Sequence, residues 1–135
     1  MNYKFLKHTA DVKFRAYGKN LNEAFANSAV AMFKSMYSGK LENKLKKEIN
    51  ISGKDLESLL YNFLEELLVL LDSKGFFLSK VRVKVNEKNL SLKAVVVGDL
   101  ASRHNISLQV KAVTYNEMFI KKIKEEYVCQ VVLDV

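Results

Sequence analysis

A run of leucines at helical spacing in the middle of the chain limits what this sequence can fold into. Apolar residues recur every three or four positions through residues 56–71, which places them on one face of an α-helix. They are Leu56, Leu59, Leu60, Phe63, Leu64, Leu67, Leu68 and Leu71. Polar residues interrupt the run, so it does not read as a membrane span. The pattern predicts an amphipathic helix that is central to the core and ends near Gly75.

A second helix is predicted nearer the N-terminus. Asn20 can cap it, and Glu23, three residues later, is the expected partner in a capping box. One face is apolar at helical spacing, and Gly39 is the expected stop. That face consists of Leu21, Ala24, Phe25, Ala29, Met32, Phe33 and Met36. Ser52 with Asp55 forms a similar capping signal before the leucine-rich helix.

The rest of the chain alternates apolar and polar residues with a period of two, which is typical of β-strands. Three strands are expected before the leucine-rich helix, at 3–7, 12–18 and 44–52, and five after Gly75, at 76–87, 90–98, 108–115, 118–125 and 127–135. The turn at 86–89 predicts a hairpin. We therefore expect one α+β domain over residues 1–135, with two main helices packed on one face of a mostly antiparallel, mixed sheet.

Composition indicates an ordinary soluble domain. The chain has 135 residues, of which 49% are hydrophobic and 27% charged. Cys129 is the only cysteine, so neither an intrachain disulfide nor a zinc site built on thiolates is available. We expect Cys129 to be a buried small hydrophobic residue. The N-terminal segment does not resemble an export signal, so the expected location is the cytoplasm, with no membrane association.

The formal net charge of +7 favours acidic partners, nucleic acid among them. In the strand expected at 76–87, valines alternate with basic residues, so one face of this strand is predicted to be basic and exposed to solvent. A basic RNA-binding module, built on Lys80, Arg82 and Lys84 with Lys121, Lys122 and Lys124, is an alternative function. Exposed aromatics do not interleave with these residues as they do in single-strand platforms. The charge is not specific evidence for this function, since lysine-rich faces are commonly just solvated.

Motifs for nucleophilic catalysis are not apparent. The sequence has neither a Gly-rich phosphate loop nor a Gly-x-Ser-x-Gly motif, and His104 is expected in a loop. Asp11 and Asp134 are more informative, because each stands at the end of an apolar strand, where a buried carboxylate must be paired or bound to a cation. Each can also be solvated or paired with a lysine. A metal-dependent hydrolase on these carboxylates is a further alternative.

Asp134 and Val135 place several oxygen donors for a hard cation close together: the side chain and backbone carbonyl of Asp134 and the α-carboxylate of Val135. Asp11 would add another if the first and last strands are neighbours. An all-oxygen cluster of this kind suits calcium, with magnesium and manganese as the other candidates. His8 could then lie behind the ligands, since residues three apart can meet across a strand end.

Four segments in order resemble the archease family over nearly the whole chain. They are HTADVKFRAYG, DLESLLYNFLEELL, VKAVTY and the C-terminal VVLDV. The resemblance implies a small α+β protein that activates the RtcB-type tRNA-splicing ligase, promoting its GTP-dependent guanylylation and multiple turnover without joining RNA itself. A chaperone-like role for RNA-modifying enzymes is also implied, and direct contact with RNA is left open.

The resemblance also implies which residues matter. A divalent cation, typically calcium, would be bound by Asp11, Asp134 and Val135, while His8 and Lys111 would lie behind these ligands or face the partner. Two positions depart from the family pattern. Lys13 replaces a usual glycine and rules out a glycine-only backbone conformation there. Asn116 replaces a frequent histidine, so a role for that histidine does not carry over.

Overall fold

The computed structural model describes residues 2–7 and 11–135, and in these ranges it contains seven strands, two α-helices and a short 3-10 helix. Along the chain they are β1 (Tyr3–Leu6), β2 (Val12–Gly18), α1 (Leu21–Met36), β3 (Leu45–Ser52), α2 (Leu56–Lys74), β4 (Phe76–Asn86), β5 (Ser91–Leu100), η1 (Ala101–Arg103), β6 (Ala112–Ile123) and β7 (Glu126–Asp134). The predicted α+β class is confirmed.

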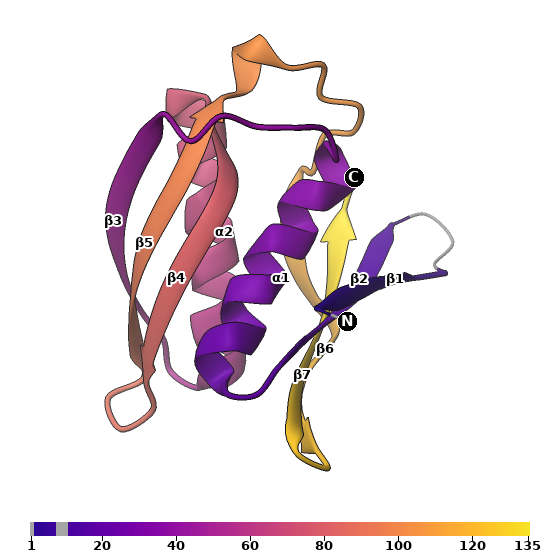
Figure 1. Cartoon of the computed structure of the whole chain (residues 1–135). Coiled ribbons are helices and arrows are strands. Elements are labelled where there is room, and N and C mark those ends of the chain that lie inside the picture. Colours follow the sequence, from indigo (N-terminus) through magenta and orange to yellow (C-terminus); the bar gives the residue numbers. More distant parts are fainter. Residues whose placement is uncertain (1, 8–10) are drawn as a thin grey trace.

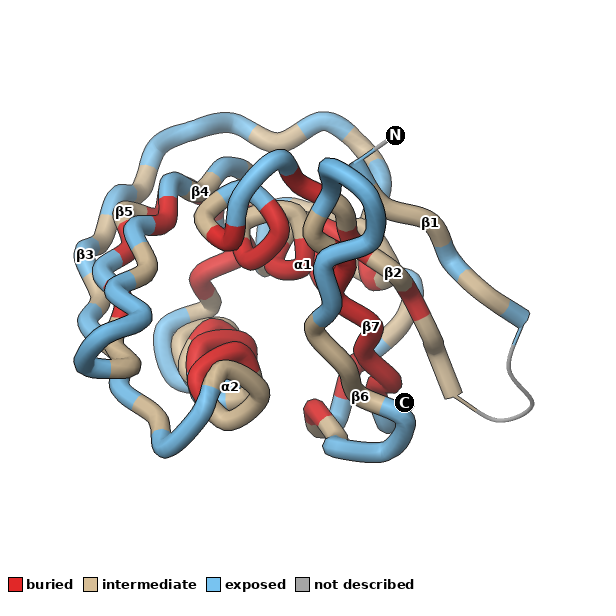
Figure 2. The backbone as a smooth tube through the Cα atoms, turned by 90° about the horizontal axis from the view of Figure 1, so that it is seen from below, coloured by how far each residue is buried: buried red, intermediate tan, exposed pale blue. Residues whose placement is uncertain are grey.

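The strands form two sheets. One has the order β1-β2-β7-β6 and the other the order β3-β5-β4, and neighbouring strands are antiparallel in both. The helices lie between the sheets: α1 packs on β2 and β7 of the first sheet and on β4 of the second, while α2 packs on β6 and on β3 and β4 (Figures 1 and 2).

The sequence pattern predicted that both helices cover one face of a single sheet. The structure instead places them between two sheets. The buried residues of α1 occupy more than half of the helix circumference, with Ala31 and Phe33 at the two edges of the buried face. A helix of this kind must be covered on more than one side, because an exposed apolar face costs free energy. Two sheets provide that cover, and Figure 2 shows the buried segments gathered between them.

The ends of the helices follow local sequence signals. The Oδ1 atom of Asn20 accepts a hydrogen bond from the Glu23 amide at 2.9 Å, which confirms the predicted cap of α1. For α2 the predicted capping pair, Ser52 with Asp55, was wrong. The capping box is formed by Asp55 and Ser58, and the backbone amide of Ser58 donates to Oδ1 of Asp55 at 2.7 Å. The helix ends at Gly75, whose φ of 65° is a conformation that glycine adopts without strain.

The predicted hairpin around residues 86–89 joins β4 and β5. Four strands, not the expected five, follow Gly75, because residues 108–115 and 118–125 contribute to one strand, β6. Its pairing with β7 is interrupted between Thr114 and Phe119. The side-chain amide of Gln130 donates to the carbonyl of Glu117 at 2.8 Å and so ties this bulge to β7. A bulge breaks the alternation of side chains, which is why the sequence reads as two strands.

Within the described part of the chain, neither helix combines the length and the apolar character that a bilayer-spanning segment requires.

Candidate functional site

Asp134 is the last residue of β7, an inner strand of the first sheet. Its Cα pairs with that of Ala112 at the start of β6. The carbonyl oxygen of Asp134 accepts a hydrogen bond from the Lys111 amide at 2.8 Å, while the Lys111 residue is exposed. The ladder therefore holds the backbone of Asp134 in place up to the end of the strand, and the residue itself is exposed.

Asp11 lies at the same end of the neighbouring strand. The β2–β7 ladder pairs Val12 with Leu133, and Asp11 comes directly before Val12. Continuing this register by one residue sets Asp11 opposite Asp134. Opposite residues of an antiparallel pair have Cβ atoms about 4.5–5.5 Å apart. The neighbour of the last strand is thus β2 and not β1, and this pairing satisfies the condition on which the site depends.

Asp11 is partly buried and lines a hollow that it shares with three lysines. The hollow is open, has a volume of about 410 Å³ and lies between the β1–β2 hairpin and the C-terminal part of α1. The other residues that line this hollow are Phe5, Leu6, Lys7, Val12, Lys13, Lys34 and Ser35. The lysines draw anionic groups to this edge of the molecule and would compete with a cation for the carboxylate.

Lys13, where a glycine is usual, is tied to the bulge of β6. Its Nζ atom lies 3.0 Å from Oε1 of Glu117, and the Lys13 side chain is only 16% exposed. Glu117 has a φ of 55°, in the left-handed region. Asn116, the second departure from the family pattern, is exposed in the same bulge. The backbone amide of Asn116 donates to Oγ1 of Thr114 at 3.3 Å. Both departures therefore lie beside the β2–β7–β6 part of the first sheet.

The donor chemistry at this strand end fits a hard divalent cation in part. Asp11 and Asp134, at the ends of two adjacent strands, would supply carboxylate oxygens, and calcium needs six to eight oxygens, which backbone carbonyls and water can complete. Over residues 2–7 and 11–135, no three side chains of the His, Cys, Asp and Glu types form a metal-binding group. His8 falls outside the described residues. The ligand set Asp11, Asp134 and Val135 stays a prediction.

A buried ionic contact that the sequence pattern did not predict lies at the C-terminal end of β5. Asp99 is 2% exposed, and its Oδ2 atom accepts a hydrogen bond from Nε2 of His104 at 2.7 Å. The amides of Leu100 and Glu42 also donate to its carboxylate. The hydrogen bond from His104, followed by these amides, lowers the pKa of Asp99 to about 2, although burial acts in the opposite direction.

His104 does follow a short 3-10 helix, so its expected location in a loop is confirmed. Its ring is hydrogen-bonded to the Asp99 carboxylate of β5, which also accepts a hydrogen bond from the Glu42 amide, so that one carboxylate joins three segments of the chain. An aspartate directly after the apolar strand Ala94–Gly98, with histidine five residues later, is the only sequence signal for this contact.

A second feature that the sequence did not reveal is an aromatic stack between α2 and the bulge of β6. The rings of Tyr61 and Tyr115 are nearly parallel, with centroids 4.3 Å apart. Burial raises the pKa of both hydroxyl groups, and in Tyr61 a hydrogen bond with Glu65 adds to the effect. The stack joins the bulge to the central helix, since Tyr115 is otherwise half exposed.

Cys129 is fully buried, as expected. Burial raises the pKa of its thiol to about 12, so the reactive thiolate is strongly disfavoured at neutral pH. Cys129 is therefore part of the core and not a nucleophile.

Comparisons with known proteins agree with this picture. The model of the Archease protein family matches residues 3–135. A protein archease of Sulfurisphaera tokodaii is 44% identical, with 98% of each chain covered, and that of Pyrococcus abyssi is 40% identical with the same coverage.

Solved structures share the fold. The solution structure of protein 1598 of Methanobacterium thermoautotrophicum superposes with a TM-score of 0.87 at 35% identity and covers 99% of both chains. An archease of Thermotoga maritima, described as a possible chaperone, has a TM-score of 0.70 at 20% identity, covering 98% of this chain and 96% of its own, and shows a likeness of fold. With a family match over nearly its whole length, this chain belongs to the archease family.

Proposed function

We propose that this chain is a cytoplasmic, non-catalytic activator of an RtcB-type tRNA-splicing ligase, and that it holds a divalent cation, calcium foremost, through Asp11, Asp134 and Val135. The observation that carries the proposal is the register of β2 on β7, which brings Asp11 and Asp134 to the same strand end. Membership of the archease family supports the choice of partner.

The strand end is suited to docking. Asp134 is exposed at the end of an inner strand, with its backbone held by Lys111 and its neighbour Val135 packed against the core. A rigid ladder therefore presents the carboxylates at the surface, where a partner can reach them. Rigid presentation lowers the entropy that is lost on binding.

In this proposal the chain acts by binding preferentially to the ligase conformation that is competent for nucleotidyl transfer. A bound cation would supply positive charge next to the phosphates of GTP. Asp11 and Asp134 would hold that charge at the interface, and the exposed Lys111 beside them would contact the partner. The ligase itself would provide the nucleophile, which agrees with the burial of Cys129.

The test is a reconstituted RNA ligation with the ligase below the substrate concentration, with and without this protein. Asp11→Asn and Asp134→Asn should abolish multiple turnover, because each removes one negative ligand while keeping the shape of the side chain. Asp72→Asn, at an exposed position near the end of α2, is the matched control and should stimulate normally.

Calcium titration followed by calorimetry gives a second readout that does not depend on the ligase. The wild type and Asp72→Asn should bind the cation, whereas Asp11→Asn and Asp134→Asn should bind it at least tenfold more weakly. Normal stimulation by either site variant, with a normal thermal transition, would refute the proposal.

A further inference from the structure

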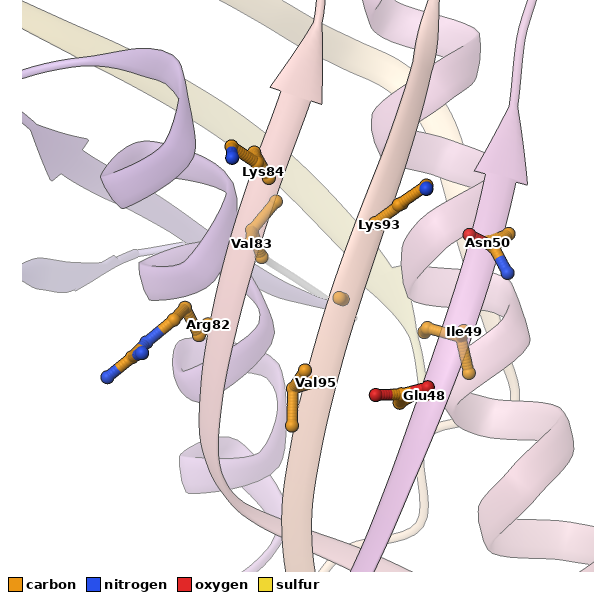
Figure 3. Close-up of a pocket in the computed structure, with 9 residues that line it drawn as sticks. Glu48, Ile49, Asn50, Arg82, Val83, Lys84, Lys93 and Val95 are labelled. Carbon is orange, nitrogen blue, oxygen red and sulfur yellow. The ribbon is translucent and has the colours of Figure 1, made fainter.

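We propose that the outer face of the β3-β5-β4 sheet binds the phosphate backbone of double-helical RNA directly. The face turned away from the helices carries the exposed side chains of alternate residues on each strand (Figure 3). Its basic residues, hereafter the basic face, are Lys46 on β3, Lys93 on β5, and Lys80, Arg82 and Lys84 on β4.

The strand register arranges these residues in rows across the sheet. Val97 is paired with Lys46 on one side and Lys80 on the other. In the next row Val95 lies between Glu48 and Arg82, and in the third Lys93 lies between Asn50 and Lys84.

Alternate residues along a strand are about 6.6–6.8 Å apart, and neighbouring strands are about 4.7–4.9 Å apart. The rows therefore form a compact grid of five cations with a single carboxylate, that of Glu48.

In the described part of the chain, the five cations of the basic face form no ion pair. Lys84 and Lys93 are direct cross-strand partners, an arrangement of like charges that destabilises a sheet. An external polyanion would relieve this repulsion, and the charge on the face is complementary to one.

The face is also hollowed. Two open cavities of about 420 and 500 Å³ share Arg82 and Val95 in their linings, and together they involve all five basic residues. The register shift between Leu78 and Lys80 marks a bulge in β4, and bulges bend a strand. In Figure 3 the labelled side chains of all three strands border one of these hollows, with the helices behind the sheet.

The composition of the face favours a nucleic-acid duplex over a protein partner. Its central apolar residues, Val95 and Val97, are small, and aromatic residues do not occupy the rows described above. Protein interfaces are enriched in buried aromatic anchors, and platforms for single strands depend on aromatic stacking. Contacts with duplex phosphates need only fixed positive charge. The choice of RNA over DNA rests on the proposed function, whereas the phosphate contact does not.

The second basic group of the sequence provides an internal control. Lys121 and Lys122 lie on β6 of the other sheet, where their ammonium groups stand over the rings of Phe119 and Tyr127, at 4.4 and 5.8 Å from the centroids. Neutralising these two lysines changes the net charge by the same amount as neutralising two residues of the basic face. A comparison therefore separates a specific surface from a general effect of charge.

The experiment measures fluorescence anisotropy of 20-base-pair RNA duplexes of two unrelated sequences, across a salt series and without the ligase. The double variant Arg82→Gln with Lys84→Gln should bind both duplexes about tenfold more weakly. Its plot of log K against log salt should be less steep, with a slope smaller in magnitude by about 1 to 2. The control, Lys121→Gln with Lys122→Gln, should bind within about threefold of wild type. Glu48→Gln should bind more tightly than wild type, since it removes the carboxylate of the face.

Three outcomes would overturn the inference. Equal losses in the two double variants would show an effect of net charge alone. Unchanged RNA binding by Arg82→Gln with Lys84→Gln would exclude the face as the RNA site, and, if that variant lost ligase stimulation, would identify it as a surface for an acidic protein. Weaker binding by Glu48→Gln would contradict the electrostatic argument. Because RNA binding is measured without the ligase, failure of the proposed function would not affect the binding results.

Discussion

The Nε2 atom of His104 lies 2.7 Å from Oδ2 of Asp99, and the Asp99 side chain is 2% exposed. Arg103 and Glu42 surround the same carboxylate, with Nη1 of Arg103 at 3.8 Å from Oδ1. The hydrogen bond from the Glu42 amide to the same carboxylate fastens the end of β5 to the segment that connects α1 with β3. A buried carboxylate with these partners makes the stability of the fold dependent on pH.

The first prediction concerns acid. The pKa of Asp99 is about 2 in the folded chain against 3.8 for the free side chain, so the folded state favours the carboxylate. This contribution to stability is fully present above pH 4 and is lost as the pH falls from about 4 through about 2. Urea unfolding of wild type and Asp99→Asn at several pH values should give a stability difference that shrinks as the pH falls from about 4 through about 2. A difference independent of pH down to 2 would contradict the assignment.

The second prediction distinguishes the observed cap of α2 from the one that the sequence indicated. Asp55→Ala should lower the free energy of unfolding by about 0.5–2 kcal/mol, because the Ser58 amide loses its acceptor. Ser52→Ala should change it by less than about 0.5 kcal/mol, since exposed positions without such a contact are nearly neutral. Chemical denaturation of both variants measures this, and equal effects would mean that Ser52 shares the capping role.

The third prediction concerns Cys129. With a pKa of about 12 and complete burial, its thiol should react with a thiol-specific reagent only when the chain unfolds. At pH 8 the native protein should remain unlabelled over minutes, and labelling in denaturant should be complete within the mixing time. Labelling rates that rise in parallel with the unfolding rate would identify global opening as the route. Rapid labelling of native protein would show that β7 opens locally.

The fourth prediction uses the proposed cation as a ligand. A cation that binds only the folded state stabilises it by about 2.7 kcal/mol at a concentration 100 times its dissociation constant. Calcium should therefore raise the Tm of wild type and of Asp72→Asn, and EDTA should reverse the shift. Asp134→Asn should show little shift, because its side chain no longer carries the charge. An equal shift in all three proteins would place calcium elsewhere on the molecule.

Much of the fold could be predicted from local patterns. The leucine-rich helix, the apolar face of Leu21–Met36 and the hairpin at residues 86–89 are all present. Each depends on contacts between residues close in sequence, whose periodicity and capping are visible in the chain itself. The single β6 strand escaped prediction because its bulge interrupts that periodicity.

For the candidate cation site, the sequence identified the residues but only the structure relates them. Asp11 and Asp134 are conspicuous as carboxylates at the ends of apolar strands, yet their proximity depends on the register of β2 on β7. Pairing between segments more than a hundred residues apart is set by the packing of whole elements and not by local preference. Lys13 shows the same limit, since its partner Glu117 comes from a distant bulge.

The sequence by itself determined the type and the approximate bounds of the elements, because helix and strand periodicities are properties of neighbouring residues. The tertiary structure alone decided that the strands divide into two sheets with the helices between them. It also paired Asp99 with His104, and placed the basic groups of β4 and β6 on separate sheets. The division into two sheets buries the apolar faces of α1 and α2 together, a requirement that only the assembled core can meet.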